Sequence, residues 1–128
     1  MKYEITHSCG HTEEVQLYGS AKERERREKA MEACKCDACR AQDARDAGIT
    51  EGSDKQAAWA LDIRREMENG LNGLVNVAAQ HKATAEQLET VRGNVAKAIE
   101  KLHGKSDARW FIDNRGASAM KLFGDLLA

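Results

Sequence analysis

All four cysteines of this 128-residue chain lie in its first third, and a histidine stands two positions after the first of them. The two segments are "SCGH" at 8–11 and "CKCDAC" at 34–39. Zinc favours cysteine and histidine ligands in a tetrahedron, and structural sites commonly use three cysteines with one histidine. The pattern C-x-H, twenty-four residues, then C-x-x-C therefore predicts a zinc site with these ligands: Cys9, His11, Cys36 and Cys39.

Four protein ligands complete the shell and leave no open position for water, so the predicted zinc is structural rather than catalytic. Cys34 and His7 are the alternative ligands, because each lies close to a predicted one. The standard two-residue gap favours the other cysteines. Cys34 is then expected to be a small buried residue at a helix end, and His7 a solvated residue at a strand end. A redox pair or a haem attachment fits less well, because no βαβ pattern is present and Arg40 follows the C-x-x-C.

The sequence also predicts the strands and helices that would position these ligands. "KYEIT" and "EEVQLY" alternate apolar and polar residues, which predicts a β-hairpin with Cys-Gly-His in its turn. Ser20 and Glu23 give the start signal of a charged helix. A second, short helix opens at the C-x-x-C knuckle and is stopped by Gly48. Residues 1–47 are therefore predicted to form a small zinc-ribbon or treble-clef-like head, a β-hairpin plus helix.

The rest of the chain predicts helices. "GITEGS" at 48–53 has two glycines and a polar centre, which is typical of a linker. Capping-box patterns open helices at Ser53 and Thr84, and the second of these helices has the clearest apolar period. Gly70 and Gly73 are expected to break or loosen the first. Residues 54–128 should form an all-α bundle of about four helices, so the fold class is α+β, mostly α.

Several apolar and mixed motifs of the body are expected to supply the bundle core. Trp59 and Trp110 are expected to be core anchors, because large aromatic side chains are usually buried. Ser106 is expected to open a short helix over "DARWFIDNR", and the last helix to bury a stripe of Met120, Phe123 and Leu127. Asp113 and Arg115 are interpreted as a structural ion pair or helix cap, with a functional polar site as the alternative.

Charge and hydropathy narrow the class of protein. The formal net charge is −1, and neither half of the chain is a basic arm or an acidic tail. The opening residues lack the apolar core of a signal peptide, and no apolar run is long enough to span a bilayer, so we expect a cytoplasmic protein.

Lys22, Arg26 and Lys29 share one face of the charged helix. Glutamates interleave with them, which favours a solvated helix over a phosphate-binding one.

Four motifs together, "CGH", "CDAC", "GSDKQAAWALDIR" and "ARWFIDNR", span most of the chain. In this combination the chain resembles a family of small uncharacterised proteins of bacteria and their phages and plasmids. Such proteins open with a "CGH" hairpin, carry a "CPxC"-like knuckle and continue with "GSxKQxxWAxxIR" and "AxxWIDNR". This chain departs from the pattern by Asp37 in place of proline and by the additional Cys34. The resemblance implies an accessory protein of a mobile element with zinc ligands at Cys9, His11, Cys36 and Cys39.

Two classes of function are compatible with these features. The first is a non-catalytic interaction protein that binds a host protein or nucleoprotein complex, for example an inhibitor of a CRISPR or restriction nuclease. The second is a nucleic-acid-binding module that uses the zinc head and the basic face of its helix. An enzymatic class ranks last, since only "WFIDNR" combines apolar and polar residues densely enough to suggest a site. The sequence does not indicate an oligomeric state.

Overall fold

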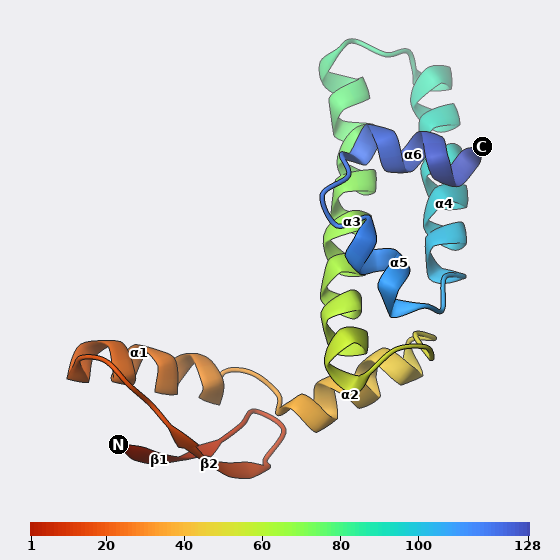
Figure 1. The fold of residues 1–128 in the computed structure, drawn as a ribbon. Helices are drawn as coiled ribbons and strands as arrows, with labels where there is room; N and C mark the ends of the chain where they lie inside the picture. Colours follow the sequence, from red (N-terminus) through yellow and green to blue (C-terminus); the bar gives the residue numbers. More distant parts are fainter. The chain divides into compact units, whose positions relative to one another are not determined.

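The computed structural model describes residues 1–128 and shows a mostly helical chain that begins with a two-stranded hairpin (Figure 1). The chain divides into two compact units, Met1–Asp43, which we call unit 1, and Ala44–Ala128, which we call unit 2. The predicted fold class, a β-hairpin and helix followed by a helical bundle, is confirmed.

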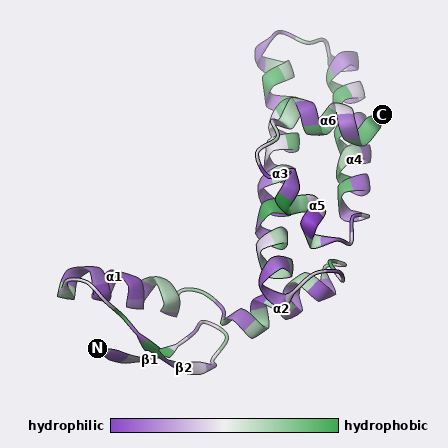
Figure 2. Ribbon diagram, in the orientation of Figure 1, coloured by the Kyte–Doolittle hydropathy of each residue, from purple (hydrophilic) through white to green (hydrophobic).

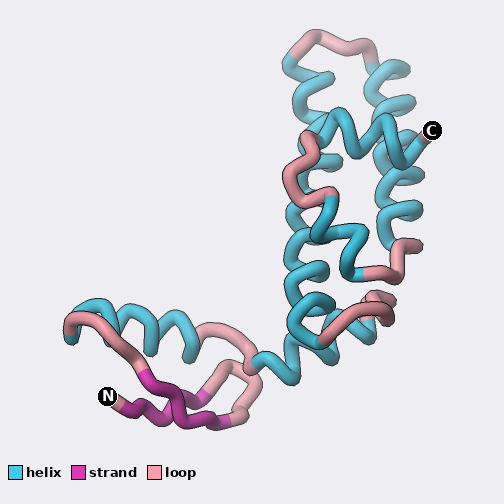
Figure 3. The backbone as a smooth tube through the Cα atoms, in the orientation of Figure 1, coloured by secondary structure: helices cyan, strands magenta, loops and turns pink.

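Unit 1 begins with strands β1 (Lys2–Thr6) and β2 (Thr12–Gln16), which pair antiparallel. Thr6 lies opposite Thr12, so residues 7–11 form the connecting loop, seen between the two magenta strands of Figure 3. Helix α1 (Ala21–Glu32) starts at the Ser20 cap, whose hydroxyl accepts the Glu23 amide at 3.2 Å. The predicted hairpin and the predicted cap are both confirmed.

The apolar core of unit 1 is small. Ile5 is fully buried, and Leu17 and Ala41 are nearly so. Helix α1 contributes no buried residue and is coloured mostly as hydrophilic in Figure 2. Since apolar burial is the main favourable term in folding, unit 1 receives little stabilisation from this source.

Helix α2 (Asp37–Asp46) begins directly after Cys36. It ends before Gly48, whose φ of +96° is a left-handed conformation that glycine adopts at little cost. The predicted stop at Gly48 is therefore confirmed.

Unit 2 is built around the long helix α3 (Asp54–Gln80), which packs against α4 (Ala85–His103), α5 (Ala108–Asp113) and α6 (Ala119–Leu127). Both predicted capping boxes are present, at Ser53 and at Thr84. The four helices enclose one apolar cluster in which Phe111, Leu71 and Leu102 are fully buried. None of the helices combines the length and apolar character needed to cross a membrane.

The expected break at Gly70 and Gly73 is wrong, because α3 runs through both residues without interruption. An interior glycine disfavours a helix by about 1 kcal/mol relative to alanine. Packing of α3 against three other helices outweighs this penalty. A Cβ built at Gly70 would lie 3.4 Å from the Ala119 Cβ, which is an ordinary van der Waals contact.

Two expected core residues lie at the surface instead. Trp59 is 45% exposed and Met120 is 65% exposed. In α6 the buried positions are Leu122 and Leu126, four residues apart, so the helix is rotated relative to the expected stripe. Trp110 is half-buried, and its ring packs edge-on against Phe111 with centroids 5.2 Å apart.

The predicted linker, residues 48–53, is packed into unit 2. Ile49 is fully buried. The Ser106 carbonyl accepts hydrogen bonds from the amides of Thr50 and Glu51, and the Ala108 amide donates back to the Glu51 carbonyl. The expected cap of α5, Ser106, is wrong: the cap is Asp107, whose carboxylate accepts a hydrogen bond from the Arg109 amide.

Candidate metal centre

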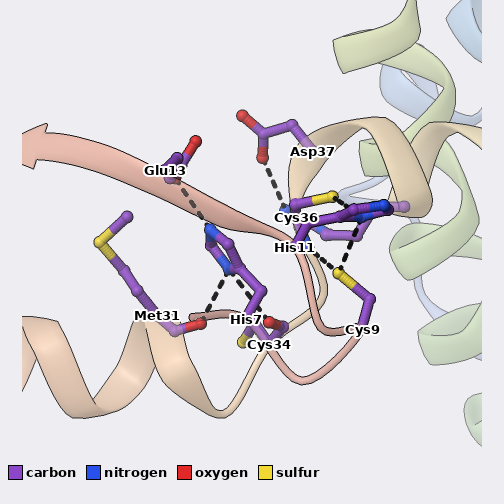
Figure 4. A network of polar contacts seen from close by, with 9 residues as sticks. His7, Cys9, His11, Glu13, Met31, Cys34, Cys36 and Asp37 are labelled. Carbon is purple, nitrogen blue, oxygen red and sulfur yellow. Dashed lines mark hydrogen bonds and ion pairs between the residues drawn. The ribbon is translucent and has the colours of Figure 1, made fainter. Parts of the chain in front are cut away.

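The loop of the hairpin positions the first pair of candidate ligands, Cys9 and His11. The His7 amide donates to the His11 carbonyl at 2.9 Å, and the Gly10 amide donates to the His7 carbonyl at 2.9 Å. These bonds close a tight turn in which Gly10 has a φ of +88°, a conformation that a residue with a Cβ rarely adopts. Cys9 and His11 consequently lie on the same side of the loop (Figure 4).

The start of α2 positions the second pair. Cys36 directly precedes the helix and Cys39 lies in its first turn. Residues three apart are neighbours on a helix surface, so the two thiols lie on one side of the first turn. The amino end of a helix carries a partial positive charge, which favours thiolates there.

The four side chains converge on one point. Their ligand atoms all lie within 4.8 Å of one another. The Nδ1 atom of His11 lies 3.5 Å from the Cys9 sulfur, 3.3 Å from the Cys36 sulfur and 3.2 Å from the Cys39 sulfur. A tetrahedral zinc site with Zn–S of about 2.3 Å and Zn–N of about 2.0–2.1 Å has nitrogen–sulfur edges of about 3.5 Å. The three nitrogen–sulfur distances are therefore close to those of a tetrahedral site, so the cluster could bind a metal ion, and no disulfide joins its cysteines.

Backbone hydrogen bonding favours negative charge at Cys9. The Cys36 amide donates to the Cys9 sulfur at 3.3 Å, and this bond is the main reason that the pKa of Cys9 is lowered to about 6. The pKa of Cys39 is raised to about 11, chiefly by its hydrogen bond with the Cys36 thiol. Three thiolates this close would repel one another, and a divalent cation between them would offset that repulsion.

The two alternative ligands lie outside the cluster, and both expectations about their surroundings are wrong. Cys34 is exposed rather than buried. His7 is buried rather than solvated, with 7% of its surface exposed. The strand pattern contained the signal for His7, since Tyr3, Ile5 and His7 alternate along β1 and its extension toward the inner side of the hairpin.

The candidate basic residues lie on helix α1, which carries none of the four clustered residues. Lys22, Arg26 and Lys29 are exposed on α1 and border one surface groove, as expected for a shared face. Lys29 also pairs with Glu25 at 3.2 Å, which reduces the free positive charge of this face.

Asp113 and Arg115 are both exposed, and of the expected ion pair or helix cap only the cap is seen, with Arg115 at the end of α5. The Arg115 guanidinium instead donates to the Ile112 carbonyl at 2.6 Å and lies 5.2 Å from the centre of the Trp59 ring. A cation over the face of tryptophan is attracted by the ring, which accounts for this position. Because the sequence favours a core position for Trp59, it does not reveal this surface pair.

No family model matches the chain, and no curated protein or solved structure matches it. The interpretation of the site therefore rests on the types and geometry of its residues. Those residues form one cluster that could bind a metal ion, in the first of the two units.

Proposed function

We propose that the chain is a non-catalytic interaction protein whose unit 1 is held in shape by one structural zinc ion. The observation that carries the proposal is the convergence of four ligand atoms from two separate segments within 4.8 Å. Three sulfurs and one imidazole nitrogen are the donors that zinc prefers, and together they fill its tetrahedral shell. A filled shell leaves no position for a reactive water, so the ion stabilises structure.

The small core of unit 1 supports a stabilising role for the ion. Domains of about 40 residues usually need a metal, disulfides or a partner, because they bury too little apolar surface. Unit 1 is of this size, and its four cysteines are free. In small zinc modules metal binding contributes about 10–16 kcal/mol of apparent free energy, and the unfolded chain has no preformed site.

For the partner surface we propose the neighbourhood of Trp59 and Arg115 in unit 2. Both residues are exposed, and Arg115 also borders a groove of about 210 Å³ whose lining includes Ile63, Met67 and Leu122. Tryptophan and arginine are enriched among residues that dominate binding energy in protein interfaces. A partner protein that inserts an apolar side chain into this groove and sets a carboxylate against Arg115 would use all of these features.

The resemblance to small phage and plasmid proteins suggests the setting of this interaction. In that setting the chain is an accessory protein of a mobile element, and its partner is a host protein or nucleoprotein complex such as a CRISPR or restriction nuclease. Inhibition of that complex is the outcome we propose for binding.

The proposal is tested by capture of partners from a bacterial lysate on the tagged protein, with and without nuclease treatment. Wild type and the control Val77→Ala, which alters another exposed apolar residue, should retain the same protein partner after nuclease treatment. Trp59→Ala combined with Arg115→Ala should lose it. A partner that the double variant retains, or bound nucleic acid as the only ligand, would contradict the proposed surface.

A second candidate function, nucleic-acid binding, is favoured by one observation: Lys22, Arg26 and Lys29 are all exposed along one side of α1. This function predicts binding to labelled DNA or RNA that weakens steeply as salt is raised. Changing Lys22 and Arg26 to glutamine should then weaken binding to all sequences alike and reduce the slope of affinity against salt. Binding that is insensitive to both changes would rule this function out.

A further inference from the structure

We propose that His7 is a positioning residue for the metal site, and that its ring fixes the distance between the two ligand pairs. This inference rests on the proposed zinc site and adds to it a residue that is not itself a ligand. His7 precedes Cys9 by two residues, yet its ring makes no bond to the side chain of any of the four ligands.

The ring of His7 bonds to three different parts of unit 1. Its Nδ1 atom lies 3.0 Å from the Met31 carbonyl oxygen and 3.2 Å from the Cys34 carbonyl oxygen. Its Nε2 atom lies 2.9 Å from a carboxylate oxygen of Glu13 (Figure 4). Since carbonyl and carboxylate oxygens accept, the ring acts as a donor on both of its edges.

Each of these bonding partners of His7 lies close in the sequence to one of the two ligand pairs. Glu13 is on β2, just after His11. Met31 is in the last turn of α1, and Cys34 stands two residues before Cys36. The Cys34 carbonyl accepts a second bond, from the Ser8 amide at 3.1 Å, so two consecutive residues of the hairpin loop hold the same oxygen.

The ring thereby ties the loop that carries Cys9 and His11 to the segment that leads into Cys36 and Cys39. Twenty-four residues separate the two pairs in the sequence, and bringing such distant segments together is entropically unfavourable. In the folded unit the bonds of the buried His7 ring join the two segments and offset part of this penalty, so metal binding has to offset less of it. The ring also keeps the Cys36 amide in line with the Cys9 sulfur, 3.3 Å away.

The experiment titrates the metal-free full chain with Co²⁺ and then exchanges Co²⁺ for Zn²⁺ against a chelator of known affinity. The variants are His7→Phe, which keeps a ring without donors, and His7→Asn, whose amide nitrogen replaces the Nδ1 donor. His81→Gln is the matched control, because His81 is an exposed histidine in unit 2. Ser8 amide exchange is measured on the zinc-saturated proteins as a readout that does not depend on affinity.

We expect His7→Phe to bind one Co²⁺ with the same absorption spectrum as wild type, because the ligand set is intact. Its metal affinity should fall by about 10–100-fold, the usual loss when a residue that supports a metal ligand is removed. His7→Asn should recover a large part of the affinity, and Ser8 exchange should be fastest in His7→Phe. The control His81→Gln should match wild type in every measurement.

Equal affinities of His7→Phe and wild type would overturn the inference. So would a failure of His7→Asn to bind more tightly than His7→Phe, including the case in which neither variant binds metal. If wild type itself takes up no Co²⁺, the proposed zinc site fails instead, and the two failures are distinguished by the wild-type titration.

Discussion

Unit 1 and unit 2 differ in what holds them together. Unit 1 buries three hydrophobic residues, Ile5, Leu17 and Ala41, within 43 residues, whereas unit 2 buries sixteen within 85. Unit 2 gathers them around one long helix that three others cover. Unit 1 has instead a cluster of four side chains that could bind a metal ion, and a hydrogen-bonded histidine.

The difference shows two ways of stabilising a small fold within one chain. In unit 2 a side chain stabilises by the apolar area that it removes from water, so each core position contributes a few kcal/mol. In unit 1 the stabilisation is concentrated in a few atoms around one point. Mutations in unit 1 should therefore cause a large loss of stability at a few positions near the cluster. In unit 2 the loss should vary with the apolar area that each core residue buries.

The largest effect is expected from removal of a metal ligand. Cys36→Ser should lower zinc affinity by more than the roughly 100-fold that accompanies loss of a residue supporting a ligand. It should also unfold unit 1 and leave the helices of unit 2 intact. Cys34→Ser is the matched control, since Cys34 is an exposed cysteine outside the cluster. Zinc content and amide NMR spectra of both variants check this, and full zinc occupancy in Cys36→Ser would disprove the ligand assignment.

Truncation in the core of unit 2 should have the next largest effect. Phe111 is fully buried, and Phe111→Ala should destabilise unit 2 by about 3–5 kcal/mol, from lost transfer energy and the cavity left behind. Urea denaturation followed by circular dichroism measures this loss. Zinc affinity should be unchanged, and a parallel fall in zinc affinity would show that the two units are not stabilised separately.

A smaller effect is expected at Arg64, a nearly buried charge in unit 2 that donates to the Ala47 carbonyl at 2.8 Å. Arg64→Met should destabilise unit 2 by about 1–3 kcal/mol, because it removes the donor from a carbonyl beyond the end of α2. Arg65→Met is the control. Arg65 is exposed, and its ion pair with Asp62 at 3.6 Å lies at the surface, where such pairs contribute little to stability. Thermal denaturation that ranks the two variants equally would contradict the role of Arg64.

The smallest effect concerns Asp107, the cap of α5. Its pKa lies below the ordinary value of 3.8, first because its carboxylate accepts the Arg109 amide and then because the Arg109 side chain is close. A carboxyl whose pKa is lower in the folded than in the unfolded chain stabilises the folded state at every pH above its unfolded pKa. This stabilisation is lost as the pH falls through the folded pKa. Asp107→Ala should lower the denaturation midpoint of unit 2 slightly at neutral pH, because it removes the cap of α5.

The same substitution should change stability less at acidic pH, because the stabilisation is lost as pH falls through the lowered pKa of Asp107. Asp107→Asn keeps the capping oxygen and should lie between wild type and Asp107→Ala at neutral pH. Denaturation midpoints of the three proteins at both pH values measure the difference. An effect of Asp107→Ala that grows toward low pH would contradict the expected direction of this pH dependence.

Features that depend on local sequence were predicted from the sequence alone. The hairpin follows from alternation around a glycine turn, the caps of α1, α3 and α4 from single hydroxyl residues, and the cluster of four candidate ligands from their spacing. Each of these signals lies within a few residues of what it specifies. Only the meeting of the two ligand pairs is long-range, and it was inferred from the chemistry of zinc.

Features that depend on packing were missed. Gly70 and Gly73 are poor helix residues by themselves, and only contacts between helices explain why α3 continues through them. Trp59 has the large aromatic side chain that is typical of a core residue, but it is exposed and lies beside Arg115. Residues 48–53 look like a linker, yet they are ordered by bonds to Ser106 and Ala108, more than fifty positions away.

The measurement that tests the central claim most directly is amide hydrogen exchange on the zinc-loaded protein before and after a chelator is added. Each unit supplies its own probes: the Ser8 and Leu17 amides of unit 1 and the amides of Leu102 and Phe111 in unit 2. After zinc is removed, the unit 1 amides should lose their protection while those of unit 2 keep it. Unit 1 amides that stay protected without metal would contradict the claim that a metal ion holds this unit together.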